Sequence, residues 1–222
     1  MNVYLHLPKT GGTSMLQTLE LILGERLFIF NRKEDLKRYD RGFVYKRDFT
    51  EIPDGTQIFM GHYIISDFPK TYDGKFMTMF RDPVERVISS YHHEFRHGTY
   101  NGTIIDYIHD NRTNQNRKVA VNMYASAIGS IYAFEKFAYI GITEYFSESI
   151  RLLCAILEIE YKSEFLHIIN VNPEKVMCDK YDTEREIKET IKLINRMDYD
   201  YYNKACDYFY EMCSKYNIKI GE

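Results

Sequence analysis

Near the N-terminus, residues 9–14 combine residue types that bind an anion: Lys9, Thr10, Gly11, Gly12, Thr13 and Ser14. Paired glycines let main-chain N–H groups approach an anion closely, and the lysine adds a mobile positive charge. An apolar run precedes this segment, and apolar residues recur at helical spacing over 15–23. The order predicts a strand, a tight turn and a helix, whose N-terminus offers unpaired N–H groups and the positive end of its dipole. Such a turn is suited to a phosphate or a sulfate.

Two simpler interpretations apply to this turn. Glycine pairs are frequent in αβ loops, so Gly11 and Gly12 alone could serve turn geometry without any ligand. The familiar phosphate-binding pattern G-x-x-x-x-G-K-[ST] is not matched, because Lys9 precedes the glycines. This difference disfavours an ordinary Walker-type ATPase.

A second segment begins at Arg81, where a predicted strand over 75–81 ends. Asp82 is a good N-cap, and Pro83 suits the first helical position because its missing N–H has no partner there. Glu85 stands three residues after the cap and can complete a capping box. We therefore expect a helix that continues to about residue 97.

The segment also has a purely structural interpretation. Standing alone, Arg81 would be an ion-pair partner for Asp82 or Glu85, because surface ion pairs are common. Ser89 alone would be an ordinary helix residue. Arg81 and Ser89 indicate an anion site only because they occur together with Lys9.

The remaining pattern alternates strands and helices. Gly24 and Gly98 are expected to close the first two helices, and an Asn- and Arg-rich loop is expected at 111–118, between two or three short helices over 103–136. A turn is expected at 170–173. Further strands are predicted at 27–30, 57–62 and 137–142, and further helices at 147–158, 183–196 and 199–216.

This alternation implies parallel pairing and an α/β fold of three layers, in which a central, mostly parallel sheet is flanked by helices. Ligands of such folds lie at the carboxyl ends of the strands. The 9–14 segment, His62 and Arg81 each follow a predicted strand, so all three should gather on one rim of the sheet.

Length and charge limit the function classes. The 222 residues, 45% hydrophobic and 27% charged, suit one domain over 1–222. A net charge of −3 disfavours a general nucleic-acid binder. From Arg26 to Arg47, eight Lys or Arg face three Asp or Glu. That excess is either a solvated surface or a patch for an anionic ligand.

The cysteines and the hydropathy pattern indicate the cellular compartment in which the protein is expected. Cys154, Cys178, Cys206 and Cys213 show neither a CxxC pair nor zinc-site spacing, so we expect reduced packing residues and no metal. The chain starts with the first strand, and no apolar run reaches the roughly 20 residues of a spanning helix. A soluble, cytoplasmic protein is expected.

Taken together, residues 6–14 and 81–91 resemble the two cofactor motifs of carbohydrate-type sulfotransferases that use 3′-phosphoadenosine-5′-phosphosulfate (PAPS), especially the heparan sulfate 2-O-sulfotransferase branch. Weaker similarity occurs at 141–146 and 170–172. The resemblance implies a P-loop-like fold. It also implies that the Lys9 to Ser14 turn binds the 5′-phosphosulfate, and that Arg81 and Ser89 hold the 3′-phosphate.

The chemistry of the donor agrees with this resemblance. A phosphosulfate at one end and a 3′-phosphate at the other require two anion sites, one of main-chain donors and one of a guanidinium with a hydroxyl. In-line sulfuryl transfer to an alcohol also needs positive charge for the departing phosphate, a role that suits Lys9, and a base for the hydroxyl proton.

For the base we favour His62, because it ends a strand on the predicted rim and histidine titrates near neutrality. The resembled branch has its catalytic histidine in a similar Gly-His segment followed by an Asp-Phe pair, here residues 67–68, but its second histidine is replaced by Met60. The competing histidines are His92, His93 and His97. His6 is expected to pack within the first strand.

The acceptor is expected to be a hydroxyl-bearing molecule, of carbohydrate type by the resemblance. Basic candidates for contacting it are Arg86, Arg96, Arg112, Arg117, Lys118 and the patch from Arg32 to Arg47. Two other functions stay open: a P-loop-like small-molecule kinase, and a non-catalytic protein that binds a nucleotide or a glycan.

Overall fold

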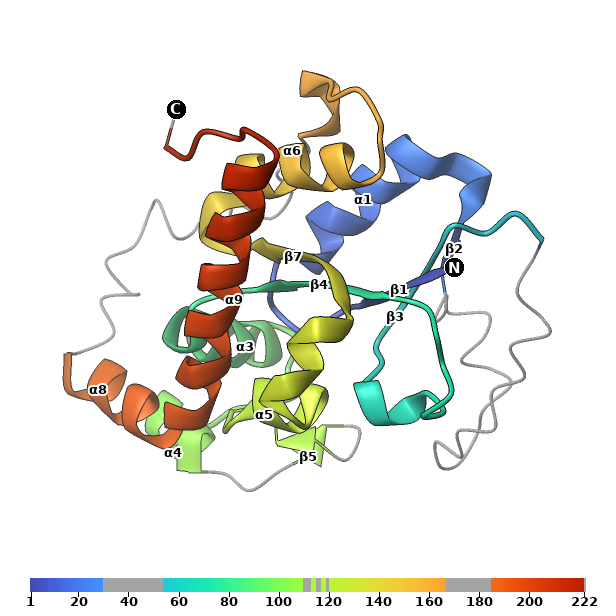
Figure 1. Ribbon diagram of the computed structural model, residues 1–222. Helices are drawn as coiled ribbons and strands as arrows, with labels where there is room; N and C mark the ends of the chain where they lie inside the picture. The colour runs from blue at the N-terminus through green and yellow to red at the C-terminus, as the bar shows by residue number, and fades with distance from the viewer. Residues whose placement is uncertain (30–53, 110–112, 115–116, 119, 167–184, 222) are drawn as a thin grey trace.

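A five-stranded sheet forms the centre of the protein (Figure 1). The computed structural model describes residues 1–29, 54–109, 113–114, 117–118, 120–166 and 185–221. The strand order is β2-β3-β1-β4-β7, and each neighbouring pair is parallel, which confirms the predicted sheet. The strands are β1 (Asn2–Leu5), β2 (Leu27–Ile29), β3 (Ile58–Gly61), β4 (Phe76–Phe80) and β7 (Phe137–Ile142).

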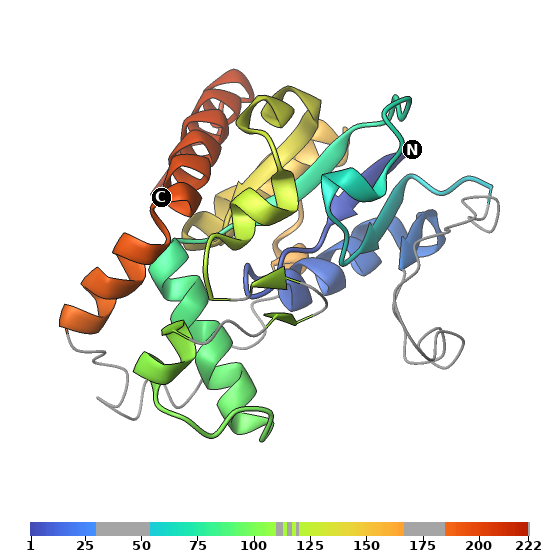
Figure 2. The same ribbon diagram turned by 90° about the horizontal axis from the view of Figure 1, so that it is seen from below.

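Helices cover both faces of this sheet, which confirms the three-layer α/β fold. The helices α1 (Gly12–Leu23) and α6 (Phe146–Ile156) lie on one face, and α3 (Pro83–Arg96) and α5 (Met123–Ile128) lie on the other (Figures 1 and 2). The long helix α9 (Arg196–Lys215) packs against the edge strand β7. In the ranges described, no helix is both long and apolar enough to cross a membrane.

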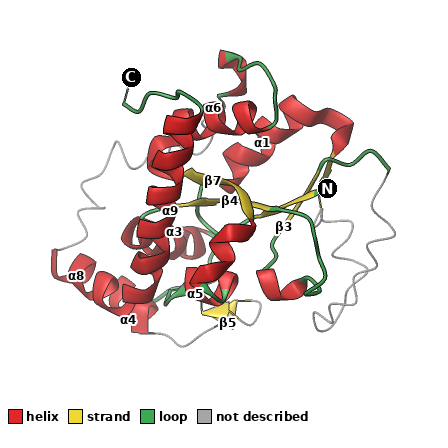
Figure 3. Cartoon of the chain, viewed as in Figure 1, coloured by secondary structure: helices red, strands yellow, loops and turns green. Residues whose placement is uncertain are grey.

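Shorter elements connect these layers (Figure 3). They are the helices α4 (Ile104–His109) and α8 (Arg185–Ile194), the strands β5 (Thr113–Asn114) and β6 (Arg117–Lys118), and the 3-10 turns η1 (Gly24–Arg26), η3 (Ile65–Asp67), η4 (Ile131–Lys136), η5 (Thr143–Tyr145) and η6 (Ser163–Phe165).

The register of the central strands sets the position of the site. Strands buried on both faces are continuously apolar, and the strands β1, β3 and β4 are buried nearly throughout. Leu5 lies opposite Gly61 on one side and opposite Thr78 on the other. The carboxyl ends of the three strands are therefore nearly level, and the residues that follow them meet at one rim.

The start of α3 agrees with the prediction except for its capping box. Asp82 Oδ1 accepts hydrogen bonds from the N–H groups of Val84 at 2.9 Å and Glu85 at 3.1 Å. The Glu85 carboxylate lies instead near Arg81, and the Asp82 N–H donates to Glu144 Oε1 at 3.0 Å. The predicted box is wrong because the carboxylate of Glu144, in η5 directly after β7, takes the place of Glu85.

Two further boundaries differ from the prediction. The expected loop at 111–118 contains the antiparallel pair β5 and β6, whose two-residue strands are too short for any periodicity to reveal. The two C-terminal helices are separated by Asn195 alone, whose side chain donates to the carbonyls of Ala120 and Ile191. Phe30, the 32–47 patch and the expected turn at 170–173 lie outside the described residues.

A buried ion pair joins α3 to α9. The side chains of Arg86 and Asp198 are fully buried, with Arg86 Nη2 3.8 Å from Asp198 Oδ2. Asp198 Oδ1 also accepts from the Ala125 N–H at 3.1 Å, near the start of α5. Burial raises the pKa of Asp198, while Arg86 and main-chain N–H groups of α5 act in the opposite direction. Arg86 is therefore a structural residue and not an acceptor contact.

Candidate functional site

The turn after β1 is built from left-handed residues. Lys9 has a φ of 66° and Gly11, the residue that caps α1, a φ of 80°. Helix α1 begins there, with the Met15 N–H donating to the Gly11 carbonyl at 3.0 Å. A left-handed lysine is uncommon, and such strain is typical of functional turns. The structure therefore has the predicted strand, turn and helix, with Lys9 before the helix N-terminus.

Hydroxyl groups anchor this turn. The buried Thr10 Oγ1 donates to the Leu7 carbonyl at 2.9 Å. Thr143 Oγ1 lies 3.0 Å from the Thr10 carbonyl oxygen and 2.9 Å from the Phe80 carbonyl oxygen, so its one proton is shared between them. Thr143 thus links the turn to the end of β4. Sequence reasoning missed this role, although Thr143 lies in the 141–146 segment that resembles sulfotransferases.

The first helical residues have different environments. A Cβ atom at Gly12 would lie 1.7 Å from His6 Nε2, so position 12 requires glycine while His6 keeps its place. Thr13 is exposed, and Ser14 is buried. The close approach of His6 to Gly12 shows that the histidine ring borders the turn.

Arg81 lies against the same turn. Its Nη1 donates to the Lys9 carbonyl oxygen at 3.5 Å, and its Nη2 lies 3.7 Å from Glu85 Oε2. The alternative ion pair therefore exists with Glu85, and Asp82 is used for capping. A partly exposed pair at this distance is worth at most about 1 kcal/mol. The structure thus brings the two predicted anion-binding segments together at Lys9 and Arg81.

Ser89 lies on α3, two turns beyond the cap, and is partly exposed. The neighbouring Ser90 is buried, and its Oγ is 2.9 Å from the Tyr107 hydroxyl. Of the two serines, Ser90 is therefore engaged in packing. Ser89, the predicted 3′-phosphate ligand, is the more exposed of the two.

Positive charge accumulates around Lys9. Its pKa is lowered by burial, then by Arg96 and by Arg81. The pKa of His93 is lowered to about 4 by burial, then by Lys9, His97 and Arg96. The end of α3 thus adds cationic groups to those of the two predicted segments, and a bound anion would relieve their mutual repulsion.

His62 follows β3 at this rim, and its tautomer can be assigned. Its Nδ1 is 2.8 Å from the main-chain carbonyl oxygen of His6. A carbonyl oxygen only accepts hydrogen bonds, so Nδ1 carries the proton and the neutral ring has its lone pair on Nε2. Nε2 is therefore the atom of His62 that can accept a proton.

The prediction that His6 packs within the first strand is wrong, because β1 ends at Leu5 and His6 lies beyond it. Its ring stacks on that of His62, with ring centroids 4.2 Å apart and planes inclined by 21°. Burial lowers the pKa of His6 to about 3, with further contributions from His62 and Lys9. Strand β1 ends at Leu5, so His6 turns toward the neighbouring segment, and no periodicity could have shown this.

Other predicted residues have different outcomes. Among the competing histidines, His97 Nδ1 lies 2.7 Å from the His93 carbonyl oxygen, and Lys9 contributes to the lowered pKa of His93. Arg96 contributes to the cationic cluster, and Arg112 lies outside the described residues. No three His, Cys, Asp or Glu side chains gather as a metal site within the described ranges.

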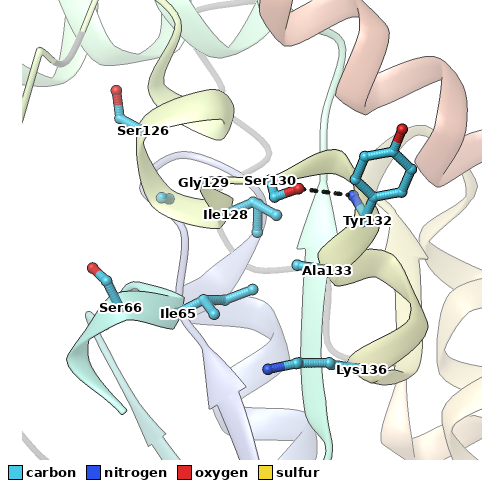
Figure 4. Close-up of a pocket in the computed structure, with 10 residues that line it drawn as sticks. Ile65, Ser66, Ser126, Ile128, Gly129, Ser130, Tyr132, Ala133 and Lys136 are labelled. Atoms are coloured by element: carbon cyan, nitrogen blue, oxygen red, sulfur yellow. Dashed lines mark hydrogen bonds between the residues drawn. The ribbon is translucent and has the colours of Figure 1, made fainter. Parts of the chain in front are cut away.

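A separate cavity of about 390 Å³ lies between η3 and the segment of α5 and η4 (Figure 4). Ile65, Ile128 and Ala133 contribute apolar surface, and Lys136 contributes a charge. None of the residues predicted for the anion site is among those that line it. The cavity is therefore distinct from the candidate site.

A crystal structure of a sulfotransferase from Alicyclobacillus acidocaldarius is similar, with a TM-score of 0.49, 15% sequence identity, and coverage of 79% of this chain and 88% of that chain. Among curated proteins, no match was found. The family model described as "Sulfotransferase family" matches residues 3–222. Because this match spans nearly the whole chain, the protein belongs to the sulfotransferase family and is a transferase enzyme.

Proposed function

We propose that this protein transfers a sulfuryl group from PAPS to a hydroxyl of a sugar or glycan by in-line displacement, with His62 as general base. The observation that carries the proposal is the meeting of three features at one rim: the Lys9 turn, the Arg81 guanidinium against the Lys9 carbonyl, and the His62 ring. The proposal also includes a single domain over 1–222 and a cytoplasmic setting, as the sequence predicts.

The residues present fit the donor. The turn from Lys9 to Ser14 would hold the 5′-phosphosulfate on main-chain N–H groups and the Lys9 ammonium, and Arg81 with Ser89 would hold the 3′-phosphate. The pKa of Lys9 is lowered by burial first, and then by Arg96 and Arg81. The contributions of the two arginines support a cationic site, which would favour a polyanion. When bound, PAPS supplies the sulfuryl group.

The roles of the protein groups follow from charge and geometry. His62 Nε2 accepts the proton of the acceptor hydroxyl as the bond from its oxygen to sulfur forms. Lys9 stabilises the negative charge that develops on the phosphate oxygen as its bond to sulfur breaks. Neutral His6 beside His62 imposes no charge repulsion on the imidazolium that results.

The acceptor class has weaker support. It rests on the resemblance of the two motifs to those of carbohydrate sulfotransferases, and on the cationic end of α3. Arg96 and Lys9 would attract an acceptor that already carries carboxylate or sulfate groups. Arg86 is excluded from this role by its burial.

Incubation with PAPS and a panel of glycans, with detection of adenosine 3′,5′-bisphosphate, tests the proposal directly. Lys9→Ala and Arg81→Ala should weaken binding of this nucleotide in calorimetry, whereas His62→Ala should leave binding nearly intact and abolish turnover. His109→Ala, at an exposed histidine of α4, is the matched control.

Failure of donor use and failure of the base assignment would give different results. Absence of both nucleotide binding and product with every acceptor would refute donor use. Full turnover by His62→Ala, together with loss in His93→Ala, would move the base to α3.

A further inference from the structure

His6 lies between the turn and the proposed base. One side of its ring stacks on His62, with centroids 4.2 Å apart. Its Nε2 edge occupies the space that a side chain at Gly12 would need. The ring therefore touches both the segment proposed to bind the donor and the residue proposed to accept the proton.

The main chain of His6 is held as firmly as its ring. Its N–H donates to the Gly61 carbonyl at 2.8 Å, and its carbonyl oxygen accepts from His62 Nδ1 at 2.8 Å. These bonds tie the residue after β1 to the residues at the end of β3. A displacement of His6 would consequently change the orientation of the His62 ring.

We infer that the side chain of His6 is a positioning residue for sulfuryl transfer, which holds the His62 ring in a fixed orientation relative to the Lys9 turn. The inference rests on the proposed function, because it takes His62 as the base. His6 does not itself exchange the reaction proton.

Shape and charge both suit His6 to this task. A flat ring fits between Gly12 and His62, where the missing Cβ of the glycine leaves room. The position also needs a neutral group, because a cation stacked on His62 would oppose its uptake of a proton. Burial lowers the pKa of His6 and keeps it neutral near pH 7, and the neighbouring titratable groups, His62 and Lys9, act in the same direction.

A merely space-filling role predicts a different result. Loss of a packing residue beside Gly12 would disturb the turn, so nucleotide affinity and turnover would fall together. Loss of a positioning residue lowers kcat and leaves the nucleotide affinity unchanged, because a small error in the orientation of the base slows the reaction itself.

The experiment compares His6→Ala, His6→Gln and His62→Ala in the full chain. We measure kcat and the KM for PAPS, the Kd for adenosine 3′,5′-bisphosphate, and thermal unfolding. His6→Ala should lower kcat on the order of tenfold or more, with Kd nearly unchanged. His6→Gln, which keeps a neutral planar group of similar reach, should recover much of kcat.

Each contrary outcome has a distinct meaning. Unchanged kcat in His6→Ala, beside an inactive His62→Ala, overturns the inference and leaves the proposed function intact. A parallel loss of kcat and affinity also overturns it, in favour of packing. An active His62→Ala refutes the base assignment itself.

Discussion

The Tyr124 hydroxyl binds both main-chain polar groups of Arg81: it donates to the carbonyl oxygen at 2.7 Å and accepts from the N–H at 3.0 Å. The Tyr124 ring is buried against Phe80, with centroids 4.7 Å apart. Tyr124 belongs to α5, whose start is held by Asp198 of α9. The position of Arg81 therefore depends on a helix near the other end of the chain.

This relationship predicts the behaviour of Tyr124→Phe. The variant leaves two main-chain groups of Arg81 without their partner, which should lower the free energy of unfolding by about 1 to 3 kcal/mol. Because Arg81 is the proposed 3′-phosphate ligand, affinity for adenosine 3′,5′-bisphosphate should fall more than affinity for adenosine 5′-phosphate. Calorimetry with both nucleotides measures the difference, and an equal loss for both would contradict it.

Lys9→Gly should separate stability from binding. The left-handed backbone at position 9 costs a non-glycine residue about 1 kcal/mol, and the substitution also removes repulsion from Arg81 and Arg96. We expect the free energy of unfolding to be unchanged or higher, while affinity for adenosine 3′,5′-bisphosphate falls about tenfold to a hundredfold. A variant that unfolds, or that binds normally, would contradict this view of the turn.

The low pKa of His6 predicts a dependence of stability on pH. Between its ordinary value of 6.5 and its folded value of about 3, the unfolded chain binds a proton at His6 that the folded protein does not. The free energy of unfolding is therefore unaffected by His6 above this window. It falls as the pH falls through the window, by up to about 1.4 kcal/mol per pH unit.

His6→Gln should remove that contribution. Urea denaturation at about pH 6, 5 and 4 should give a shallower decline for the variant than for the native chain. Identical slopes would mean that His6 takes up its proton in the folded protein as readily as in the unfolded chain.

Arg86→Met tests the buried ion pair. Removing the guanidinium leaves the Asp198 charge buried without its partner, which should cost about 3 to 5 kcal/mol of stability. The double variant with Asp198→Asn should recover part of this loss, because no buried charge remains. In both variants, the folded fraction should retain affinity for the acceptor. A selective loss of acceptor affinity without loss of stability would show that Arg86 does contact the acceptor.

Much of the fold could be read from local patterns. The buried runs marked the strands, and Asp82 with Pro83 marked the start of α3, because capping is decided by a few adjacent residues. The capping box failed where a distant residue, Glu144, competed with Glu85 for the same N–H group. The sequence predicted Arg86 as an acceptor contact, whereas the structure buries it beside Asp198 of α9, a contact distant in sequence.

By itself, the sequence determined that a tight turn at Lys9 joins the first strand to a helix, because a glycine pair before a helix is a local feature. It also determined the parallel sheet, which places Lys9, His62 and Arg81 on one rim. Only the tertiary structure decided which histidine borders the turn. The pairing of Leu5 with Gly61 brings the residues after β1 and β3 together, so that His6 stacks on His62. Such strand register is a long-range property that no local pattern contains.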